Sequence, residues 1–184
     1  MNEEVLRKIT IGEPQRVNGP IRIVEYDPVW PALFEKEATR IRAALGDRVV
    51  FIEHVGSTAV PGLAAKPRID ILLVVADTAI EAAYVPQLEA AGYVLRIREP
   101  EWFEHRVFKG PDIDINLHCF SDGCPEIDRM IAFRDCLRSN EADRLLYERT
   151  KLDLASKTWQ YVQEYADAKT AVVKEILSRA QPSS

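Results

Sequence analysis

The segment from Glu53 to Asp70 brings together the residue types that bind phosphate groups. It reads EHVGSTAVPGLAAKPRID and lies between two apolar runs. A glycine lets the backbone approach a ligand closely, hydroxyl groups donate hydrogen bonds, and a helix beginning there would point its N–H groups at an anion. Two cations near the end of the segment add positive charge. The candidate nucleotide-binding residues here are His54, Gly56, Ser57, Thr58, Lys66 and Arg68.

Asp70 lies early in the nearly apolar run RIDILLVV, residues 68–75. A carboxylate in such a buried strand is costly unless it is paired or binds a cation, so a magnesium ion is a natural explanation. Ordinary explanations also remain open, because Gly-Ser-Thr occurs at turns and Asp70 could pair with Arg68 or accept backbone hydrogen bonds. The combination of strand, loop and carboxylate favours a binding site.

A second polar group lies on the later run DIDINLH, which begins at Asp112. Polar and apolar residues alternate there, so Asp112, Asp114, Asn116 and His118 share one face of a strand. A solvated sheet face would give the same pattern. We interpret the run as functional: Asp114 completes a magnesium site with Asp70, Asn116 holds a ribose or phosphate, and His118 moves a proton.

Two other chemistries receive little support from the sequence. A zinc site at His118, Cys119 and Cys124 is weak, because the first two residues are adjacent on a strand and point to opposite faces. A hydrolase that uses Ser57 and His54 is also weak, because the nucleophile-elbow motif is absent.

The elements that must position these residues form a mixed sheet with helices around it. Residues 1–20 contain Gly and Pro with little periodicity and are predicted to be an irregular arm. We expect one α/β (α+β) domain over residues 21–180, with a mixed sheet over about 21–120 and helices over about 125–179. Strands are predicted over 21–24, 49–52, 68–75, 93–97, 103–108 and 113–120. Helices are predicted from the Asp27-Pro28 start to about residue 45 and over 78–91, 126–139, 141–156 and 158–179.

Composition limits the partners of the protein. The 184 residues suit one domain, and the net charge of −5 provides no global cationic field for a nucleic acid. Three cysteines without a secretory leader indicate reduced thiols inside a cell, and no stretch is long and apolar enough to span a bilayer. We therefore expect a cytoplasmic protein that binds neither nucleic acid nor membrane. The oligomeric state is not indicated.

The segment HVGSTAVPGLAAKPRIDILLVV, residues 54–75, resembles the GrpB family of the nucleotidyltransferase superfamily. The resemblance covers nearly the whole chain and implies a small nucleotidyltransferase-like fold, a kind of domain sometimes fused to dephospho-CoA kinase. It adds three candidate nucleotide-binding residues: Lys169 could reach a triphosphate, Tyr165 could stack on a base, and Lys151 could add charge. A solvated lysine beside a partly buried tyrosine is equally ordinary. Further matching segments are 26–31, 116–118, 133–135 and 147–151.

The resemblance implies a magnesium-dependent transferase that passes a nucleotidyl group from ATP or another nucleoside triphosphate to a small-molecule acceptor. Adenylation of a carboxylate would make the same site a ligase. The wider superfamily uses two carboxylates separated by one residue, and here Asp70 fits the first but Leu72 stands in the second place. Leu72 supports the alternative, a nucleotide- or CoA-like ligand-binding module that has lost catalysis.

Overall fold

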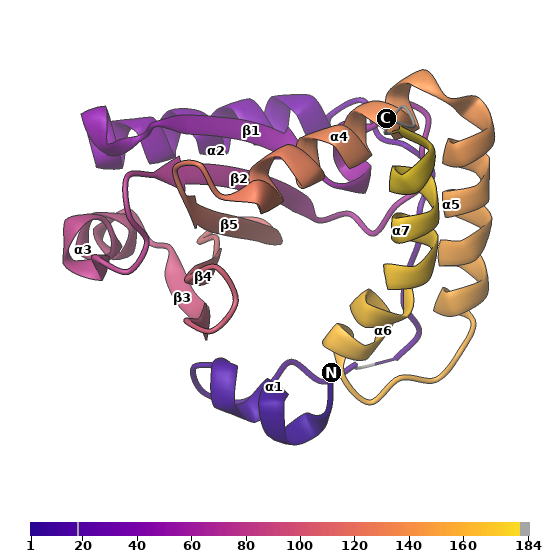
Figure 1. Cartoon of the computed structure of the whole chain (residues 1–184), viewed down its shortest axis with the longest axis horizontal. Coiled ribbons are helices and arrows are strands. Elements are labelled where there is room, and N and C mark those ends of the chain that lie inside the picture. Colours follow the sequence, from indigo (N-terminus) through magenta and orange to yellow (C-terminus); the bar gives the residue numbers. More distant parts are fainter. Residues whose placement is uncertain (18, 181–184) are drawn as a thin grey trace.

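The computed structural model describes residues 1–17 and 19–180 and contains one five-stranded mixed sheet with helices on both faces (Figure 1). The strand order is β1-β2-β5-β4-β3, in which only the β2–β5 pair is parallel. This confirms the predicted fold class. The strands are β1 (Phe51–Val55), β2 (Ile69–Val75), β3 (Val94–Glu99), β4 (His105–Lys109) and β5 (Ile115–Ser121).

The helices form two covering layers and an extension. They are α1 (Glu3–Ile9), α2 (Trp30–Leu45), α3 (Val85–Ala90), α4 (Pro125–Ser139), α5 (Glu141–Ala155), α6 (Val162–Ala168) and α7 (Thr170–Ala180). Helices α2 and α3 pack on one face of the sheet and α4 packs on the other. Helices α5, α6 and α7 stand together to one side of the sheet (Figure 1). No helix in the described part of the chain is long and apolar enough to cross a bilayer.

Strand β2 is apolar on both sides because both sides are covered. Ile71 and Leu73 join the core formed with α2 and α3, whereas Leu72 and Val74 pack against α4. A strand buried on both faces requires such a continuous apolar run. The prediction that this strand lies inside the sheet is confirmed, and β5 is the middle strand.

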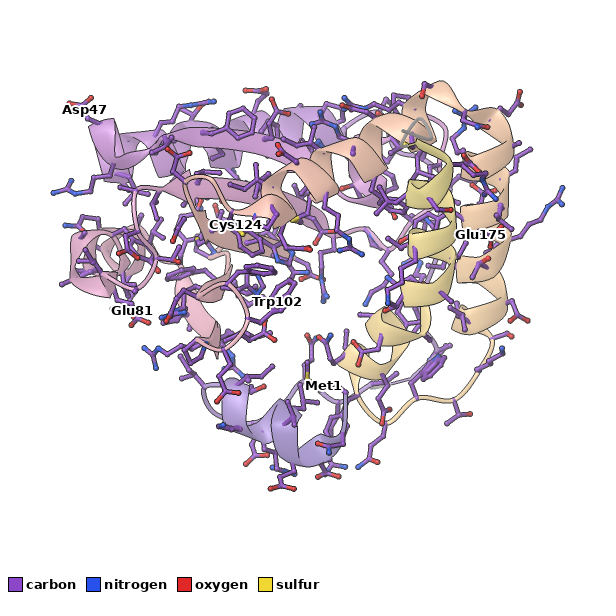
Figure 2. All side chains as sticks on the ribbon, in the orientation of Figure 1. Met1, Asp47, Glu81, Trp102, Cys124 and Glu175 are labelled. Atoms are coloured by element: carbon purple, nitrogen blue, oxygen red, sulfur yellow. The ribbon has the colours of Figure 1, made fainter. Side chains whose placement is uncertain are left out.

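The N-terminal arm is more regular than predicted. Helix α1 lies within residues 1–20, where the Asn2 side chain accepts a hydrogen bond from Val5 N and acidic residues occupy the first turn. Both features stabilise a helix N-terminus. The arm joins the edge of the sheet to α6 through a bridge between Thr10 and Ile97 and an ion pair of 2.6 Å from the Met1 amino group to Asp167. Figure 2 labels Met1 at the N-terminal end of this arm.

Other differences from the predicted elements have local causes. Residues 21–24 form no named strand and only a single bridge joins Val24 to Ala65. The helix predicted over 78–91 shortens to a 3-10 turn and α3, because Pro86 at the start of α3 lacks an N–H group and restricts the residue before it. Helix 158–179 divides into α6 and α7 at Lys169. Asn140, between the predicted helices 126–139 and 141–156, caps α5 by accepting a hydrogen bond from Asp143 N.

Candidate functional site

Gly56 and Asp70 are in direct contact at the end of β1. The register pairs Val55 with Asp70, so the chain turns at Gly56 directly above the carboxylate. Gly56 has φ of 71°, and a Cβ atom there would lie 2.5 Å from Asp70 Oδ2. Only glycine combines a left-handed backbone with no side chain. The Gly-Ser loop, defined here as residues 56–59, therefore lies against Asp70, and Ser57 follows at the start of a 3-10 turn.

His54 and Thr58 brace the Gly-Ser loop from inside. Thr58 Oγ1 donates to Arg68 O at 3.1 Å, so His54 Nε2, which lies 3.0 Å from the same oxygen, must be the donor in their contact. His54 stacks on Phe34, and burial lowers its pKa to about 4. Both were predicted as nucleotide-binding residues, but their hydrogen-bonding groups are used within the protein. They position the loop.

Asp70 is joined to two of the predicted residues on β5. In the parallel register Asp70 faces Asn116, whose Nδ2 donates to Asp70 Oδ1 at 2.9 Å. His118 Nε2 lies 3.7 Å from the same oxygen. Burial raises the pKa of Asp70, but Arg68, Asn116 and the protonated form of His118 outweigh burial and lower it. The carboxylate is therefore ionised in the folded protein.

Four cationic side chains lie near enough to Asp70 for their charges to interact with it: Lys66, Arg68, Lys109 and Lys169. Burial is the largest cause that lowers the pKa of Lys109 and of Lys169, each to about 8. Neighbouring cations lower both further, while Asp70 acts in the opposite direction. The site is thus a concentration of positive charge in a protein whose net charge is −5.

Asp112 and Asp114 lie before β5 and not on it, because the strand begins at Ile115. Arg68 Nε donates to both carboxylate oxygens of Asp114, at 2.9 and 2.8 Å, and Lys109 Nζ lies 3.6 Å from Asp114. Asp112 pairs with Arg40 of α2. The predicted common polar face therefore holds for Asn116 and His118, whereas Asp114 is engaged by Arg68.

The residues present do not fit a resident magnesium ion. Within residues 1–17 and 19–180 no group of three or more His, Cys, Asp and Glu side chains is placed to hold a metal. Leu72, in the expected place of a second carboxylate, is fully buried, and the oxygens of Asp114 bind Arg68. Magnesium requires several oxygen ligands. Cations occupy the surroundings of Asp70 instead.

Two helical residues predicted to bind a nucleotide are already engaged. Lys151, buried on α5, donates through Nζ to Ala64 O and lies over the Tyr147 ring. Tyr165 is also buried, so its ring is not open for a base to stack on. Lys66 Nζ and Lys169 Nζ lie 5.7 and 4.6 Å from the centre of the Tyr165 ring.

Lys109 and Glu99 belong to this region but were not singled out from the sequence. Lys109 Nζ donates to Asn116 Oδ1 at 2.6 Å, and Glu99 Oε2 lies 2.7 Å from His105 Nδ1. The sequence signal that could have identified Lys109 is the pair of predicted strands over 103–108 and 113–120. Pairing these strands as a hairpin places Lys109 beside Asn116.

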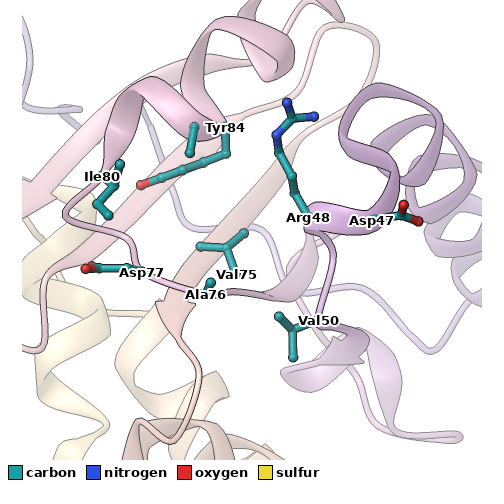
Figure 3. A pocket seen from close by; sticks show the side chains of 9 residues that line it. Asp47, Arg48, Val50, Val75, Ala76, Asp77, Ile80 and Tyr84 are labelled. Carbon is teal, nitrogen blue, oxygen red and sulfur yellow. The ribbon is translucent and has the colours of Figure 1, made fainter.

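The pocket drawn in Figure 3 lies at the other end of β2. Its lining includes Val75, Ala76 and Asp77, which end or follow that strand, and Tyr84. It contains none of the predicted site residues. It is lined mainly by apolar side chains, so its chemistry differs from that around Asp70.

Known proteins resemble this chain over most of its length. The family described as GrpB protein matches residues 20–179. A UPF0157 protein of Halalkalibacterium halodurans is 61% identical over 178 residues, 97% of this chain and 91% of that protein. The crystal structure of conserved protein GrpB from Enterococcus faecalis has a TM-score of 0.76 and 34% identity, covering 86% of this chain and 96% of that one. A dephospho-CoA kinase of Mycolicibacterium paratuberculosis is 43% identical over 82 residues, 43% of this chain and 20% of that protein.

Proposed function

This chain belongs to the GrpB family, and we propose that it binds the phosphate groups of a nucleotide, with cationic side chains in the place of a resident metal ion. The observation that carries the proposal is the convergence of Lys66, Arg68, Lys109 and Lys169 around Asp70 beside the Gly-Ser loop. Charged hydrogen bonds from lysine and arginine are the usual way to hold phosphate oxygens.

The electrostatics of the ligand-free site support an anionic ligand. The ammonium groups of Lys66 and Lys169 have no carboxylate within ion-pair distance among residues 1–17 and 19–180. Burial lowers the pKa of both, so their charged forms are destabilised without a partner. A phosphate between them would offset this cost. Both ammonium groups lie over the ring of Tyr165, and the buried hydroxyl of that residue lacks a hydrogen-bond partner in the described chain.

A nucleotide is the phosphate ligand that the GrpB resemblance favours. ATP and the other nucleoside triphosphates carry enough phosphate charge for four cations. A relative carries the name dephospho-CoA kinase, so dephospho-CoA and CoA belong among the candidate ligands. This is the function of a ligand-binding module, which agrees with the buried Leu72.

Isothermal titration calorimetry tests this proposal. ATP, GTP, CTP, UTP, dephospho-CoA and CoA are titrated into the protein in EDTA, and the tightest ligand is then titrated into Lys169→Met. Loss of one charged hydrogen bond should weaken binding about tenfold. Lys174→Met is the matched control, because Lys174 is exposed on α7, and it should leave the affinity unchanged. Absence of binding by every ligand, or equal affinity in Lys169→Met, would overturn the proposal.

Nucleotidyl transfer to a small-molecule acceptor is the second candidate function. The observation that favours it is the placement of Ser57, Asp70 and His118 at one site, where a hydroxyl, a carboxylate and an imidazole could orient an acceptor and accept its proton. Hydroxyl and amine acceptors suit this proton transfer, whereas a carboxylate acceptor is already ionised and would only need to be oriented. Pyrophosphate release from each triphosphate with pooled acceptors measures the activity. Release that persists unchanged in Asp70→Asn would exclude this site as its source.

A further inference from the structure

Four neighbouring strands each contribute one side chain to a continuous line of titratable groups. In strand order the line comprises Asp70 of β2, His118 of β5, His105 of β4 and Glu99 of β3. His118 Nδ1 lies 3.1 Å from His105 Nε2, and His105 Nδ1 lies 2.7 Å from Glu99 Oε2. His118 Nε2 faces Asp70 Oδ1 at 3.7 Å. The line runs from the β3 edge of the sheet to the Gly-Ser loop.

The ring of His105 is held in place by aromatic packing. It stacks on Phe120 with the ring centres 4.5 Å apart and an interplanar angle of 14°. Trp102 packs edge-on against it, with the centres 5.1 Å apart. His105 is also buried, whereas His118 is partly exposed toward the site. The two nitrogen atoms of His105 therefore have fixed directions.

The hydrogen-bonding capacities determine where the protons lie. An ionised carboxylate only accepts, so His105 Nδ1 donates to Glu99. Burial keeps His105 neutral, with its pKa lowered to about 4, so its Nε2 carries a lone pair and accepts from His118 Nδ1. The neutral form of His118 then has its remaining lone pair on Nε2, beside Asp70. If Glu99 did not fix His105, both tautomers of His118 would be available.

We propose that Glu99 and His105 are positioning residues that hold His118 as the Nδ1–H tautomer, with Nε2 ready to accept a proton from a hydroxyl of the bound ligand. In that step, which belongs to the nucleotidyl transfer proposed above, the O–H bond of the acceptor hydroxyl breaks as its oxygen bonds to the α-phosphorus of the triphosphate. An N–H bond forms at Nε2, and pyrophosphate leaves with the electron pair of the broken P–O bond. The resulting imidazolium donates to His105 through Nδ1 and faces Asp70 through Nε2. The proton transfer rests on the second proposed function, nucleotidyl transfer at the phosphate site, whereas the tautomer of the ligand-free protein does not.

Long-range proton–nitrogen NMR of the ¹⁵N-histidine-labelled, ligand-free protein tests this inference. At a pH where His118 is neutral, its proton should lie on Nδ1 in essentially all molecules. In His105→Phe, which keeps the aromatic stack but removes the acceptor, the proton should move to Nε2, because Asp70 is then the remaining acceptor. In Glu99→Gln the amide can also donate to His105 Nδ1, so His118 should become a mixture of tautomers.

The matched control is Glu101→Gln, which makes the same chemical change at an exposed carboxylate in the adjacent turn. It should leave the His118 tautomer unchanged. An Nε2–H tautomer in the wild-type protein would overturn the inference, and this result does not depend on any variant folding. An unchanged tautomer in both folded variants would also overturn it. Failure of nucleotide binding, with the NMR outcome as expected, would remove the proposed function alone.

Discussion

Gly56 and Asp70 depend on each other, because the Asp70 carboxylate occupies the space that a side chain at position 56 would need. The Gly56→Ala substitution should therefore destabilise the fold through both backbone strain and a clash. We expect it to lower the free energy of unfolding by about 3 kcal/mol, measured by urea denaturation.

Gly62→Ala is the control for that substitution. Gly62 has φ of +77°, and in the described part of the chain no atom beyond its sequence neighbours lies within 4 Å of the position that a methyl group would take. Only backbone strain of about 1 kcal/mol is therefore expected. The Asp70→Ala change should rescue part of the loss in a Gly56→Ala background, but not in a Gly62→Ala background. Equal losses at both glycines would contradict the contact between Gly56 and Asp70.

Individual site residues could be predicted from the sequence where the pattern within a single strand identifies them. The alternation in DIDINLH identified Asn116 and His118, and the lone carboxylate in an apolar strand identified Asp70. The roles of other residues depend on contacts between distant strands. Arg68 binds Asp114 across 46 residues of sequence, and such a pair requires a known sheet register.

At the scale of elements, the Gly-Ser loop and the segment that follows it are held by two different helices. Helix α4 supplies Arg138, which donates to Ala59 O at 2.9 and 2.8 Å, and α5 supplies Glu148, which accepts from Ala64 N at 2.8 Å. Inside the loop the Thr58 hydroxyl connects His54 to the backbone at Arg68. The loop is therefore pre-formed by the protein before any ligand binds.

The Thr58→Val substitution tests this bracing, because valine keeps the shape of threonine but leaves His54 Nε2 and Arg68 O without their shared partner. We expect a loss of about 2 kcal/mol in the free energy of unfolding, measured by urea denaturation. Thr58→Ser retains the hydroxyl and removes only a methyl group, so it should cost about 1 kcal/mol. A valine variant as stable as the wild type would show that the hydroxyl does not brace the loop.

The elements themselves were largely predictable from periodicity and caps. The hairpin of β4 and β5, helix α2 and the Asn140 cap all follow local signals. The N-terminal helix was missed because its glycines and prolines lie after Ile9 and mark only the end of the helix. Residues 21–24 have strand-like composition, yet only one bridge forms there, since pairing depends on a neighbour that composition does not reveal.

At the scale of the whole molecule, the fold assembles a cationic site from distant segments of an acidic chain. Lys66, Arg68 and Lys109 come from the sheet region, while Lys169 comes from the junction of α6 and α7. Placing the helical extension beside the sheet brings these charges together (Figure 1). A local field of this kind would attract the phosphate groups of the proposed ligand.

The pH dependence of ATP binding should follow the protonation of Lys109 and Lys169. In the ligand-free protein Lys109 and Lys169 have pKa values of about 8, so both are charged at pH 7 and mostly neutral at pH 9.5. A bound phosphate favours the charged forms, so binding above pH 8 requires proton uptake and affinity falls as pH rises. We expect the Kd for ATP, measured by calorimetry, to be at least tenfold higher at pH 9.5 than at pH 7.

The Lys169→Met variant tests whether Lys109 and Lys169 cause this pH dependence, because it removes one of the two titrating groups. The variant should bind more weakly at pH 7 and lose a smaller factor between pH 7 and pH 9.5. An affinity for ATP that is independent of pH over this range would show that the two lysines do not contact the phosphates.

The measurement that most directly tests the central claim is the affinity for ATP with and without magnesium, determined by calorimetry on the wild-type protein at pH 7. If Lys66, Arg68, Lys109 and Lys169 take the place of a resident metal ion, ATP binds in excess EDTA, and magnesium changes its Kd by less than about threefold, under 1 kcal/mol. Binding that is lost in EDTA and restored by magnesium would contradict the account.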